Sequence, residues 1–308
     1  MKLYIIIFAI TIQSGASYKR KPQCHACFNS ICYSRSPIFQ KYRISGQLAV
    51  ERKGNIVHYH YADSKSKDHT EAFDLDDIRF LNVPDIEFSF ARAVDQATRD
   101  VYIGGGNGIF KYNSISNKTT RVGLFDKTIW HIQYKDKIYY TEFMKKGLYT
   151  YSGKSISIPA LVDYKIDDFV IDKRDDIYFM SNLTMFVLKK GEKKPTMFSN
   201  IVYSLSTDIN DSVYFTQSVN RGLYKVDYRT GNQTEVGAFS NGSPVKIVFD
   251  NYNNVIYYDS DTEKLFYLTP NYGRCRVKND GWGETMKKMV ASFYEEPHAT
   301  RVGHTDTL

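Results

Sequence analysis

A short phrase recurs six times along this chain: an apolar run, a turn that usually contains Asp, and a β-branched residue followed in most copies by an aromatic one. The clearest copies are Ala93–Ile103, Phe169–Phe179, Leu205–Phe215 and Ile247–Tyr258, and two weaker ones are Leu48–Tyr59 and His131–Tyr140. Successive copies lie 44, 37, 39, 36 and 43 residues apart, measured at the residue after the β-branched position: His58, Tyr102, Tyr139, Tyr178, Tyr214 and Tyr257. A period near 40 residues with only strand patterns inside it predicts the blades of a β-propeller.

Each copy continues into two further strands. A third strand is expected about ten residues after each aromatic position, in the segments 108–112, 147–151, 185–188, 222–226 and 264–268. A fourth follows a turn rich in Gly, Asn, Ser and Lys, as in TTRVG and QTEVG. A sandwich or a barrel also contains many short strands, but a fixed period with an internal signature favours repeated blades. We therefore expect an all-β fold, a single six-bladed β-propeller.

The chain begins with the pattern of a secretory signal peptide: Lys2, an apolar run over Leu3–Ile12, and the small residues SGAS. The run is too short to span a bilayer, and no later segment replaces it. We expect a signal peptide at 1–17, a cysteine-containing segment at 18–37, the propeller at 38–277, and a tail at 278–308 that is disordered or forms a short helix. The mature protein would then be secreted, extracellular, and not bound to a membrane.

Cysteine usage agrees with export. Three of the four cysteines (Cys24, Cys27 and Cys32) precede the first blade, and Cys275 follows the last one. A metal site at CHAC is the alternative, but one cluster without a second C-x-x-C or a downstream His pair is a weak signal. Two disulfides suit an oxidising compartment better, and one of them must then join Cys275 to the N-terminal segment as a clasp. Spacing does not identify the partner, although we favour the pairs Cys27–Cys32 and Cys24–Cys275.

The composition of the chain limits which binding partners are expected. The formal net charge is +7 and the aromatic content 15%, but the only basic run is KRK at 19–21, so nucleic-acid binding is not expected. Four N-x-S/T sites fall in predicted turns or at strand ends, and a fifth, at Asn241, is weakened by Pro244. We expect a monomeric glycoprotein with glycans at Asn117, Asn182, Asn210 and Asn232.

Catalytic signatures are missing from the sequence. It contains no G-x-S-x-G, H-E-x-x-H or P-loop pattern. The glycine-rich stretch Gly104–Gly108 lies between two predicted strands with no helix after it, so it predicts a hairpin turn rather than a phosphate site. His58 and His60 alternate on one strand, where both could reach a metal, but exposed surface positions are the simpler interpretation.

The best candidates for a site lie where the innermost strands begin, around the central channel of a propeller. Counting back four positions from each turn Asp or its equivalent gives Gln47, Ala91, Trp130, Asp168, Ser204 and Lys246, and the neighbouring residues add Arg92, His131, Asp167 and Tyr203. Equivalent positions of a structural repeat tend to carry the same residue, whereas this position differs in every blade, which indicates a binding pocket. The alternative is a ring of polar residues that are simply hydrated at the channel mouth. The ligand-binding candidates are Gln47, Arg92, Trp130, His131, Asp168, Tyr203 and Lys246.

With these features in place, the chain resembles the insect ommochrome-binding proteins, haemolymph pigment carriers of moths and butterflies. The similarity is carried by CHACFNSICY, ARAVDQATRDVYIGGGNGIFKYN, IWHIQYKDKIYYTEF, DDFVIDKRDDIYF and VFDNYNNVIYYDSDTEKLFYLTPN, and it extends from about Cys24 to Arg276. The resemblance implies non-enzymatic binding of a small aromatic ligand, a phenoxazinone pigment or a related tryptophan metabolite, without a cofactor. In that case Trp130 and Tyr203 would stack on the ligand. Its carboxylates would meet Arg92 and Lys246, and its ammonium would meet Asp168.

A more distant similarity is to the gluconolactonase, regucalcin and paraoxonase class of six-bladed hydrolases. These resemble the chain in architecture and hold a channel cation with a Glu, one or two Asn and an Asp. Here Asp168 is the one carboxylate certain to lie in the ring, beside the cations Arg92 and Lys246, and a hard divalent cation needs several oxygen ligands. A divalent-cation-dependent lactonase or esterase is therefore the alternative function, and we expect no metal in the channel.

Overall fold

The computed structural model describes residues 24–38, 43–81, 83–84, 86, 88–217 and 220–275. The expected signal peptide (1–17) and tail (278–308) lie outside these residues. Apart from a single 3-10 turn, η1 (Pro159–Leu161), every regular element in the described chain is a β-strand. No helix in this part of the chain is long and apolar enough to cross a membrane.

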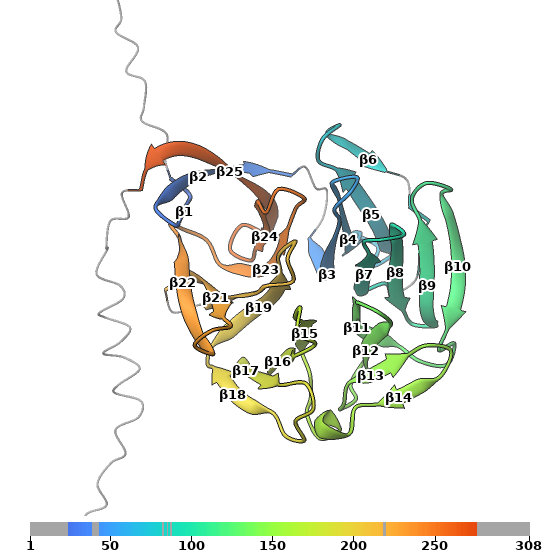
Figure 1. The fold of residues 1–308 in the computed structure, drawn as a ribbon. Coiled ribbons are helices and arrows are strands. Elements are labelled where there is room, and N and C mark those ends of the chain that lie inside the picture. The colour runs from blue at the N-terminus through green and yellow to red at the C-terminus, as the bar shows by residue number, and fades with distance from the viewer. Residues whose placement is uncertain are drawn as a thin grey trace, which may run out of the picture.

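Six four-stranded blades surround a central axis, so the protein is the six-bladed propeller that the repeat predicted (Figure 1). Blade 1 contains β3 (Ile44–Glu51), β4 (Ile56–Ala62), β5 (Asp68–Asp74) and β6 (Arg79–Leu81). Blade 2 contains β7 (Ala91–Asp95), β8 (Asp100–Gly105), β9 (Gly108–Asn113) and β10 (Lys118–Gly123). Blade 3 contains β11 (Ile129–Tyr134), β12 (Ile138–Glu142), β13 (Tyr149–Tyr151) and β14 (Ser155–Ser157).

The remaining blades follow the same order from the axis outward. Blade 4 contains β15 (Asp168–Ile171), β16 (Ile177–Ser181), β17 (Thr184–Leu188) and β18 (Thr196–Ser199). Blade 5 contains β19 (Val202–Thr207), β20 (Val213–Gln217), β21 (Gly222–Asp227) and β22 (Asn232–Phe239). Blade 6 contains β23 (Pro244–Phe249), β24 (Val255–Asp259) and β25 (Lys264–Arg274) from the end of the chain, with β2 (Ile31–Pro37) as its outermost strand.

The ring is closed by main-chain pairing between the two ends of the chain. The N-terminal strand β2 runs antiparallel to β25, with Ser34 opposite Thr269 and Arg35 opposite Leu268. The preceding strand, β1 (Ala26–Phe28), pairs with β2 on one side and with β22 of blade 5 on the other. Blades 5 and 6 therefore form one continuous nine-stranded sheet. An edge that would otherwise face solvent is thus covered by the N-terminal hairpin.

Two disulfides support this closure, but their pairing is the reverse of the favoured one. Cys24 is bonded to Cys32, with Cα atoms 5.3 Å apart, and Cys27 is bonded to Cys275, with Cα atoms 5.8 Å apart. The clasp to the last blade exists as expected, because one bond spans 248 residues. The predicted partner of Cys275 was wrong. Strand β1 lies between β2 and β22, and Cys275 follows the last residue of β25 beside the β1–β2 turn, where Cys27 is within reach.

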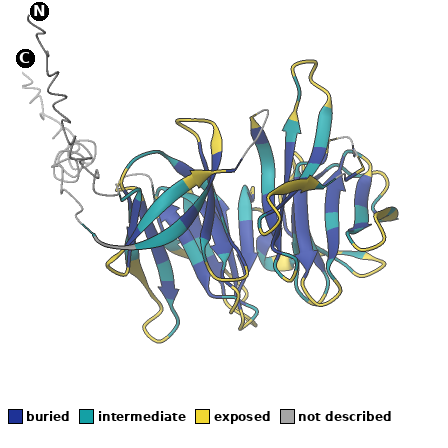
Figure 2. Ribbon diagram, turned by 90° about the horizontal axis from the view of Figure 1, so that it is seen from above, coloured by how far each residue is buried: buried dark blue, intermediate teal, exposed yellow. Residues whose placement is uncertain are grey.

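Apolar side chains fill the space between neighbouring blades. The buried clusters alternate around the ring, and each one joins strands from two adjacent blades, as Val170 of blade 4 and Leu205 of blade 5 do. Stacked aromatic pairs such as Phe179 and Phe186 occur at 5.3 Å within these layers. Figure 2 shows buried residues concentrated in the strands and exposed ones in the connecting loops. The many Tyr and Phe residues therefore serve mainly to pack flat sheets against each other.

Candidate functional site

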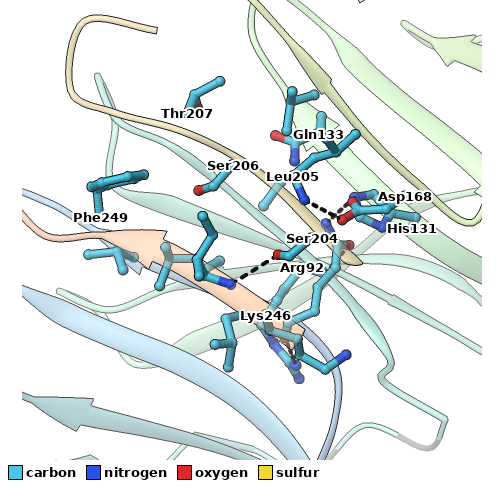
Figure 3. A pocket seen from close by; sticks show the side chains of 18 of the residues that line it. Arg92, His131, Gln133, Asp168, Ser204, Leu205, Ser206, Thr207, Lys246 and Phe249 are labelled. Carbon is cyan, nitrogen blue, oxygen red and sulfur yellow. Dashed lines mark hydrogen bonds and ion pairs between the residues drawn. The ribbon is translucent and has the colours of Figure 1, made fainter. Parts of the chain in front are cut away.

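A cavity of about 300 Å³ occupies the central channel, and innermost strands from all six blades line it (Figure 3). Its lining includes every residue that the sequence singled out as a ligand contact: Gln47, Arg92, Trp130, His131, Asp168, Tyr203 and Lys246. Asp167 and Ser204 line it as well, whereas Ala91 is fully buried beside it. The structure thus brings the predicted residues together; whether they bind a ligand is a separate question.

In blade 3 the ring position lies one residue later in the sequence than expected. There His131, rather than Trp130, matches Asp168 and Ser204 when the strands are aligned on their pairing with the second strand. Trp130 is the extra residue of an irregularity between Ile129 and His131, and similar irregularities precede Ser204 and Lys246. Such bulges bend a strand and redirect its side chains. The bulge does not cause the shift, because the same irregularity precedes Ser204 and Lys246. In blade 3 the turn begins at Lys135, whose N–H bonds to the carbonyl of Lys137, and without an Asp to mark it the count began one residue too early.

Several ring residues have a structural task that sequence alone did not show. The side chain of Ser204 accepts a hydrogen bond from the backbone N–H of Ile247 at 3.0 Å. Asp168 Oδ2 accepts one from the N–H of Leu205 at 3.1 Å. In both cases a polar side chain of one blade satisfies the first free backbone donor of the next innermost strand. Part of the polarity around this ring therefore links neighbouring blades.

Gln47 links three blades at once. Its Oε1 accepts hydrogen bonds from the backbone N–H groups of Arg92 (3.1 Å) and Ile132 (2.8 Å). Its Nε2 donates to the carbonyl of Ile132 at 2.9 Å and lies 2.6 Å from His131 Nε2. Blade 2 has Ala91 at the ring position, which cannot accept a hydrogen bond, and Gln47 extends past it to blade 3. The amide is fully used, so Gln47 organises the site rather than offering free groups to a ligand.

A glycine makes this arrangement possible. Gly46 has φ +69°, and a Cβ there would lie 2.2 Å from the carbonyl oxygen of Phe90. That carbonyl accepts the backbone N–H of Gln47 at 2.7 Å. The close approach of the two strands therefore requires a residue without a side chain.

His131 and Asp168 form a buried pair beside Gln47. The distance from His131 Nε2 to Asp168 Oδ1 is 3.1 Å. Burial, reinforced by the charge of Lys246, lowers the pKa of His131 to about 3. Burial raises the pKa of Asp168 to about 7, although the Leu205 N–H and Lys246 both oppose that rise. At neutral pH the ring of His131 is therefore uncharged, and Asp168 is close to its titration midpoint.

Arg92 is almost fully buried, with 1% of its surface exposed, at a position that is apolar in blades 3 to 6. Its guanidinium donates to the carbonyls of Gln47 at 2.8 Å and Ser89 at 2.9 Å, and its Nε has no hydrogen-bond partner among the described residues. No carboxylate of the described chain forms an ion pair with it, and burial lowers its pKa to about 9. Arg92 therefore contributes positive potential to the channel while its hydrogen bonds hold the main chain.

Lys246 differs from the other polar ring residues because its ammonium forms no hydrogen bond or ion pair within the described part of the chain. Burial lowers its pKa, while Asp168 opposes the shift and Arg92 adds to it. Figure 3 shows Lys246 beside Arg92 at one end of the pocket. A partly buried ammonium without a partner is costly unless something else compensates it.

Further aromatic rings lie next to Trp130, which lines the channel cavity. The Trp130 ring lies 5.8 Å from Phe90 and 5.3 Å from Phe143, and Phe88 lies 6.3 Å from Phe90. Phe88, Trp130 and Phe143 are 53%, 36% and 46% exposed. This aromatic rim, which we define as Phe88, Phe90, Trp130 and Phe143, was predicted only at Trp130. The other three belong to loops or strand ends outside the repeat, so the period gave no signal for them.

The opposite end of the channel is crossed by a side chain. Arg52 follows the innermost strand of blade 1, and its Nη2 donates to the carbonyls of Thr207 at 3.2 Å and Asp208 at 3.0 Å in blade 5. Arg52 and Thr207 also line the cavity. Arg52 therefore narrows the cavity at the end opposite Trp130.

The two histidines of blade 1 are buried, which corrects the expectation that they lie on the surface. His58 and His60 have no exposed area. His60 is placed by Ser45 Oγ at 2.5 Å and Asp68 Oδ1 at 3.0 Å, whereas neither ring nitrogen of His58 has a partner within the described chain. The strand is covered by blade 2, where the His58 ring meets Tyr112. The described residues contain no group of three or more His, Cys, Asp or Glu side chains placed to hold a metal ion.

Other predicted features lie where the sequence put them. Gly105 pairs with Gly108 across a tight turn, as expected for a hairpin. The four sequon asparagines Asn117, Asn182, Asn210 and Asn232 are exposed in turns or at a strand start. Their positions leave room for glycans; glycosylation itself stays a prediction.

Comparison with known proteins adds a distant relative. No family model matches the chain. The chain is 21% identical over 229 residues to the ommochrome-binding protein of Manduca sexta, covering 70% of this chain and 80% of that protein. This identity supports a distant relationship to that protein.

Solved structures confirm the fold. A gluconolactonase from Xanthomonas campestris superimposes with a TM-score of 0.58 at 10% identity, covering 82% of this chain and 96% of that chain. A protein of unknown function from Bacteroides thetaiotaomicron gives 0.57 at 13% identity, over 80% and 75% of the two chains. The WD40 repeats of RRP9 give 0.56 at 8% identity, over 81% and 100%. These similarities concern the propeller architecture and leave the activity open.

Proposed function

We propose that this protein is a secreted, non-enzymatic carrier that holds a small, flat, anionic aromatic molecule in its central channel, with phenoxazinone pigments of the ommochrome type as the first candidates. The observation that carries this proposal is the unpartnered ammonium of Lys246 at one end of a cavity that Trp130 of the aromatic rim lines. A flat ring would stack at the rim and its carboxylate would compensate the lysine.

The distant similarity to the Manduca sexta protein supports the class of ligand. The two disulfides support secretion, because such bonds persist in oxidising compartments. Haemolymph is the compartment that this relative suggests, and we propose it as the site of action. The cavity volume of about 300 Å³ is at the lower end of the range for small-molecule sites, so part of a tricyclic pigment would remain at the aromatic rim.

The residues of the channel favour binding over hydrolysis. A channel cation would need several free oxygen ligands, but Asp168 is engaged by His131 and Leu205, and Asp167 accepts the N–H of Asn182 at 2.8 Å. The nearest charges are the cations Lys246 and Arg92, which would repel a metal ion. We therefore place the lactonase or esterase second.

Titration of the purified protein with xanthommatin, followed by absorbance shifts and tryptophan fluorescence, tests the proposal. We expect saturable binding in the micromolar range or tighter, weakened about 5- to 100-fold by Trp130→Ala because a stacking partner is lost. Tyr252→Ala is the matched control, since Tyr252 is 67% exposed in a turn outside the cavity lining. Absence of binding at tens of micromolar would reject pigments as the ligand.

A further inference from the structure

The protonation state of the channel can be read from its hydrogen bonds, beginning with the amide of Gln47. Two backbone N–H groups, of Arg92 and Ile132, point at one end of this amide, and the carbonyl of Ile132 faces the other end. Donors must meet the amide oxygen, and an acceptor must meet the amide nitrogen. These three contacts fix the orientation of the amide independently of His131. The group that lies 2.6 Å from His131 Nε2 is therefore an N–H donor.

The orientation of Gln47 determines the tautomer of His131. Because Nε2 receives the N–H of Gln47, it carries a lone pair and no proton. A neutral imidazole carries one ring proton, so that proton lies on Nδ1. The low pKa of His131, about 3, agrees with a neutral ring.

The tautomer of His131 in turn determines the state of Asp168. Oδ1 of Asp168 lies 3.1 Å from the unprotonated Nε2, and Oδ2 already accepts the N–H of Leu205. The single lone pair of Nε2 is taken by the N–H of Gln47, but this nitrogen keeps a negative partial charge, which at 3.1 Å disfavours an ionised carboxylate relative to a neutral carboxylic acid. The pKa of Asp168, raised to about 7, is consistent with a retained proton. The other charged groups facing Asp168 are Lys246 and Asp167, and Arg92 lies beyond Lys246.

A neutral Asp168 leaves the positive charge of Lys246 uncompensated. We propose that Asp168 is the specificity-determining residue of the channel: held as a neutral acid by the Gln47–His131 pair, it makes the site select ligands that place a carboxylate beside Lys246 and reject ligands that place an ammonium there. This inference rests on the proposed function, because it assumes that the channel holds a small molecule. It replaces the expectation that Asp168 pairs with an ammonium group of the ligand.

The proposal fixes the direction of a pH dependence. Above about pH 7 Asp168 loses its proton and its negative charge neutralises Lys246. The affinity for an anion therefore falls as the pH rises, and binding an anion near pH 7 to 8 takes up a proton. Burial lowers the pKa of Lys246, and an ionised Asp168 opposes that shift.

The test compares two probes of the same shape, 2-naphthoate and 2-naphthylmethylammonium, by calorimetry at pH 6 and pH 8.5. At pH 6 we expect the carboxylate to bind at least tenfold more tightly than the ammonium, and at pH 8.5 its affinity to be several-fold lower. Asp168→Asn places a neutral side chain of the same size beside His131, so it should retain the preference and lose the pH dependence. Asp167→Asn removes a charge that helps to raise the pKa of Asp168, so it should retain the preference and move the pH dependence to lower pH.

Nitrogen-15 NMR of the histidine rings gives a readout without any ligand. We expect His131 to show a protonated Nδ1 and an unprotonated Nε2 from pH 5 to 7, and Gln47→Glu to move the proton to Nε2, because a carboxylate there accepts instead of donating. Equal affinity for the two probes, or an Nε2-protonated His131 in the unaltered protein, would overturn the inference about Asp168. The proposed carrier function would still stand if xanthommatin bound. Failure of xanthommatin and both probes to bind would overturn both proposals.

Discussion

Gln47 and His131 are 84 residues apart in the sequence, yet the side-chain amide nitrogen of one lies 2.6 Å from Nε2 of the other. The contact spans blades 1 and 3, because blade 2 has only Ala91 at the ring position between them. Gln47 thus satisfies the backbone of two following blades and also orients the one histidine that faces the channel cavity. The same amide serves the fold and the site, which is why the two are difficult to separate by mutation at this residue.

Asp168 allows such a separation, because its proton affects stability in a defined pH window. Its folded-state pKa, about 7, is above the ordinary value of 3.8. Between about pH 4 and 7 the folded protein keeps a proton that the unfolded chain has released, so stability falls as the pH rises through this window and levels off above it. Relative to Asp168→Asn, the unaltered protein should lose up to about 4 kcal/mol across the window, at about 1.4 kcal/mol per pKa unit.

Urea unfolding of both proteins at pH 4.5, 6 and 8 measures this difference. Asp167→Asn is the control, because it removes the adjacent acid without altering the contact with His131. A pH slope that is the same with and without Asp168 would show that this carboxyl is ionised in the folded protein throughout.

The two disulfides should contribute unequally to the stability of the folded protein. The Cys27–Cys275 bond closes a loop of 248 residues and the Cys24–Cys32 bond a loop of 8. In the chain-entropy model these loops correspond to about 5 and about 2.5 kcal/mol. We expect the double serine variant at Cys27 and Cys275 to melt at a clearly lower temperature than the variant at Cys24 and Cys32. Equal losses would indicate that the pairing of β2 with β25 closes the ring without help.

The repeat was sufficient to predict the blades, because a period of about 40 residues with alternating polarity has few solutions. It also brought Lys246, Asp168 and His131 to one place, since equivalent positions of a propeller face the same axis. It could not supply an unmarked turn or effects of non-local geometry. The turn of blade 3 begins at Lys135 without an Asp to mark it, and the β1 hairpin exchanges the expected disulfide partners.

Burial was the second source of error. His58 and His60 look like surface residues in an alternating strand, but blade 2 covers that face, and both are fully buried. The rest of the aromatic rim was missed because Phe90 and Phe143 lie outside the repeated phrase and meet Trp130 only in the folded ring. Contacts between blades depend on residues about 40 positions apart, which no local pattern records.

His58 should lower the stability of the folded protein. Neither of its ring nitrogens has a partner within the described chain, and burial followed by the charge of Arg92 lowers its pKa to about 3. The unfolded chain binds a proton below pH 6.5 that the folded protein refuses, so stability falls as the pH decreases from 6.5. His58→Leu should therefore raise stability by about 1 kcal/mol at pH 7 and by more at pH 5.

His60→Leu is the matched control, since it removes a ring that Ser45 and Asp68 do satisfy, and it should destabilise the protein at pH 7. Thermal unfolding at pH 5 and 7 distinguishes the two variants. If His58→Leu melted below the unaltered protein at both pH values, packing around the ring would outweigh its unsatisfied nitrogens.

Chelation and reduction should have opposite consequences for a carrier and for a metal-dependent hydrolase. A channel cation that binds the folded state stabilises it, so EDTA would lower the melting temperature of such an enzyme. We expect no change with EDTA, no turnover of lactones or aryl esters with added Ca²⁺, and a decrease of several degrees with a reductant that opens Cys27–Cys275. A chelator-dependent loss of stability together with lactone hydrolysis would place the enzyme first.

Lys246 should show a conflict between stability and binding. Its ammonium has no partner within the described chain, and burial lowers its pKa, so the folded state holds this charge less readily than the unfolded chain does. Lys246→Met keeps the length of the side chain and removes the charge. We expect it to raise the free energy of unfolding by about 1–2 kcal/mol at pH 7 and to weaken xanthommatin binding about 10- to 100-fold.

Lys225→Met is the control, because Lys225 lies 5.0 Å from the Tyr214 ring and outside the cavity lining; it should leave pigment affinity unchanged. A residue that destabilises the fold while it strengthens binding is what selection for a ligand leaves behind. If Lys246→Met lost stability and kept full affinity, the lysine would be a structural residue and the anion would bind elsewhere.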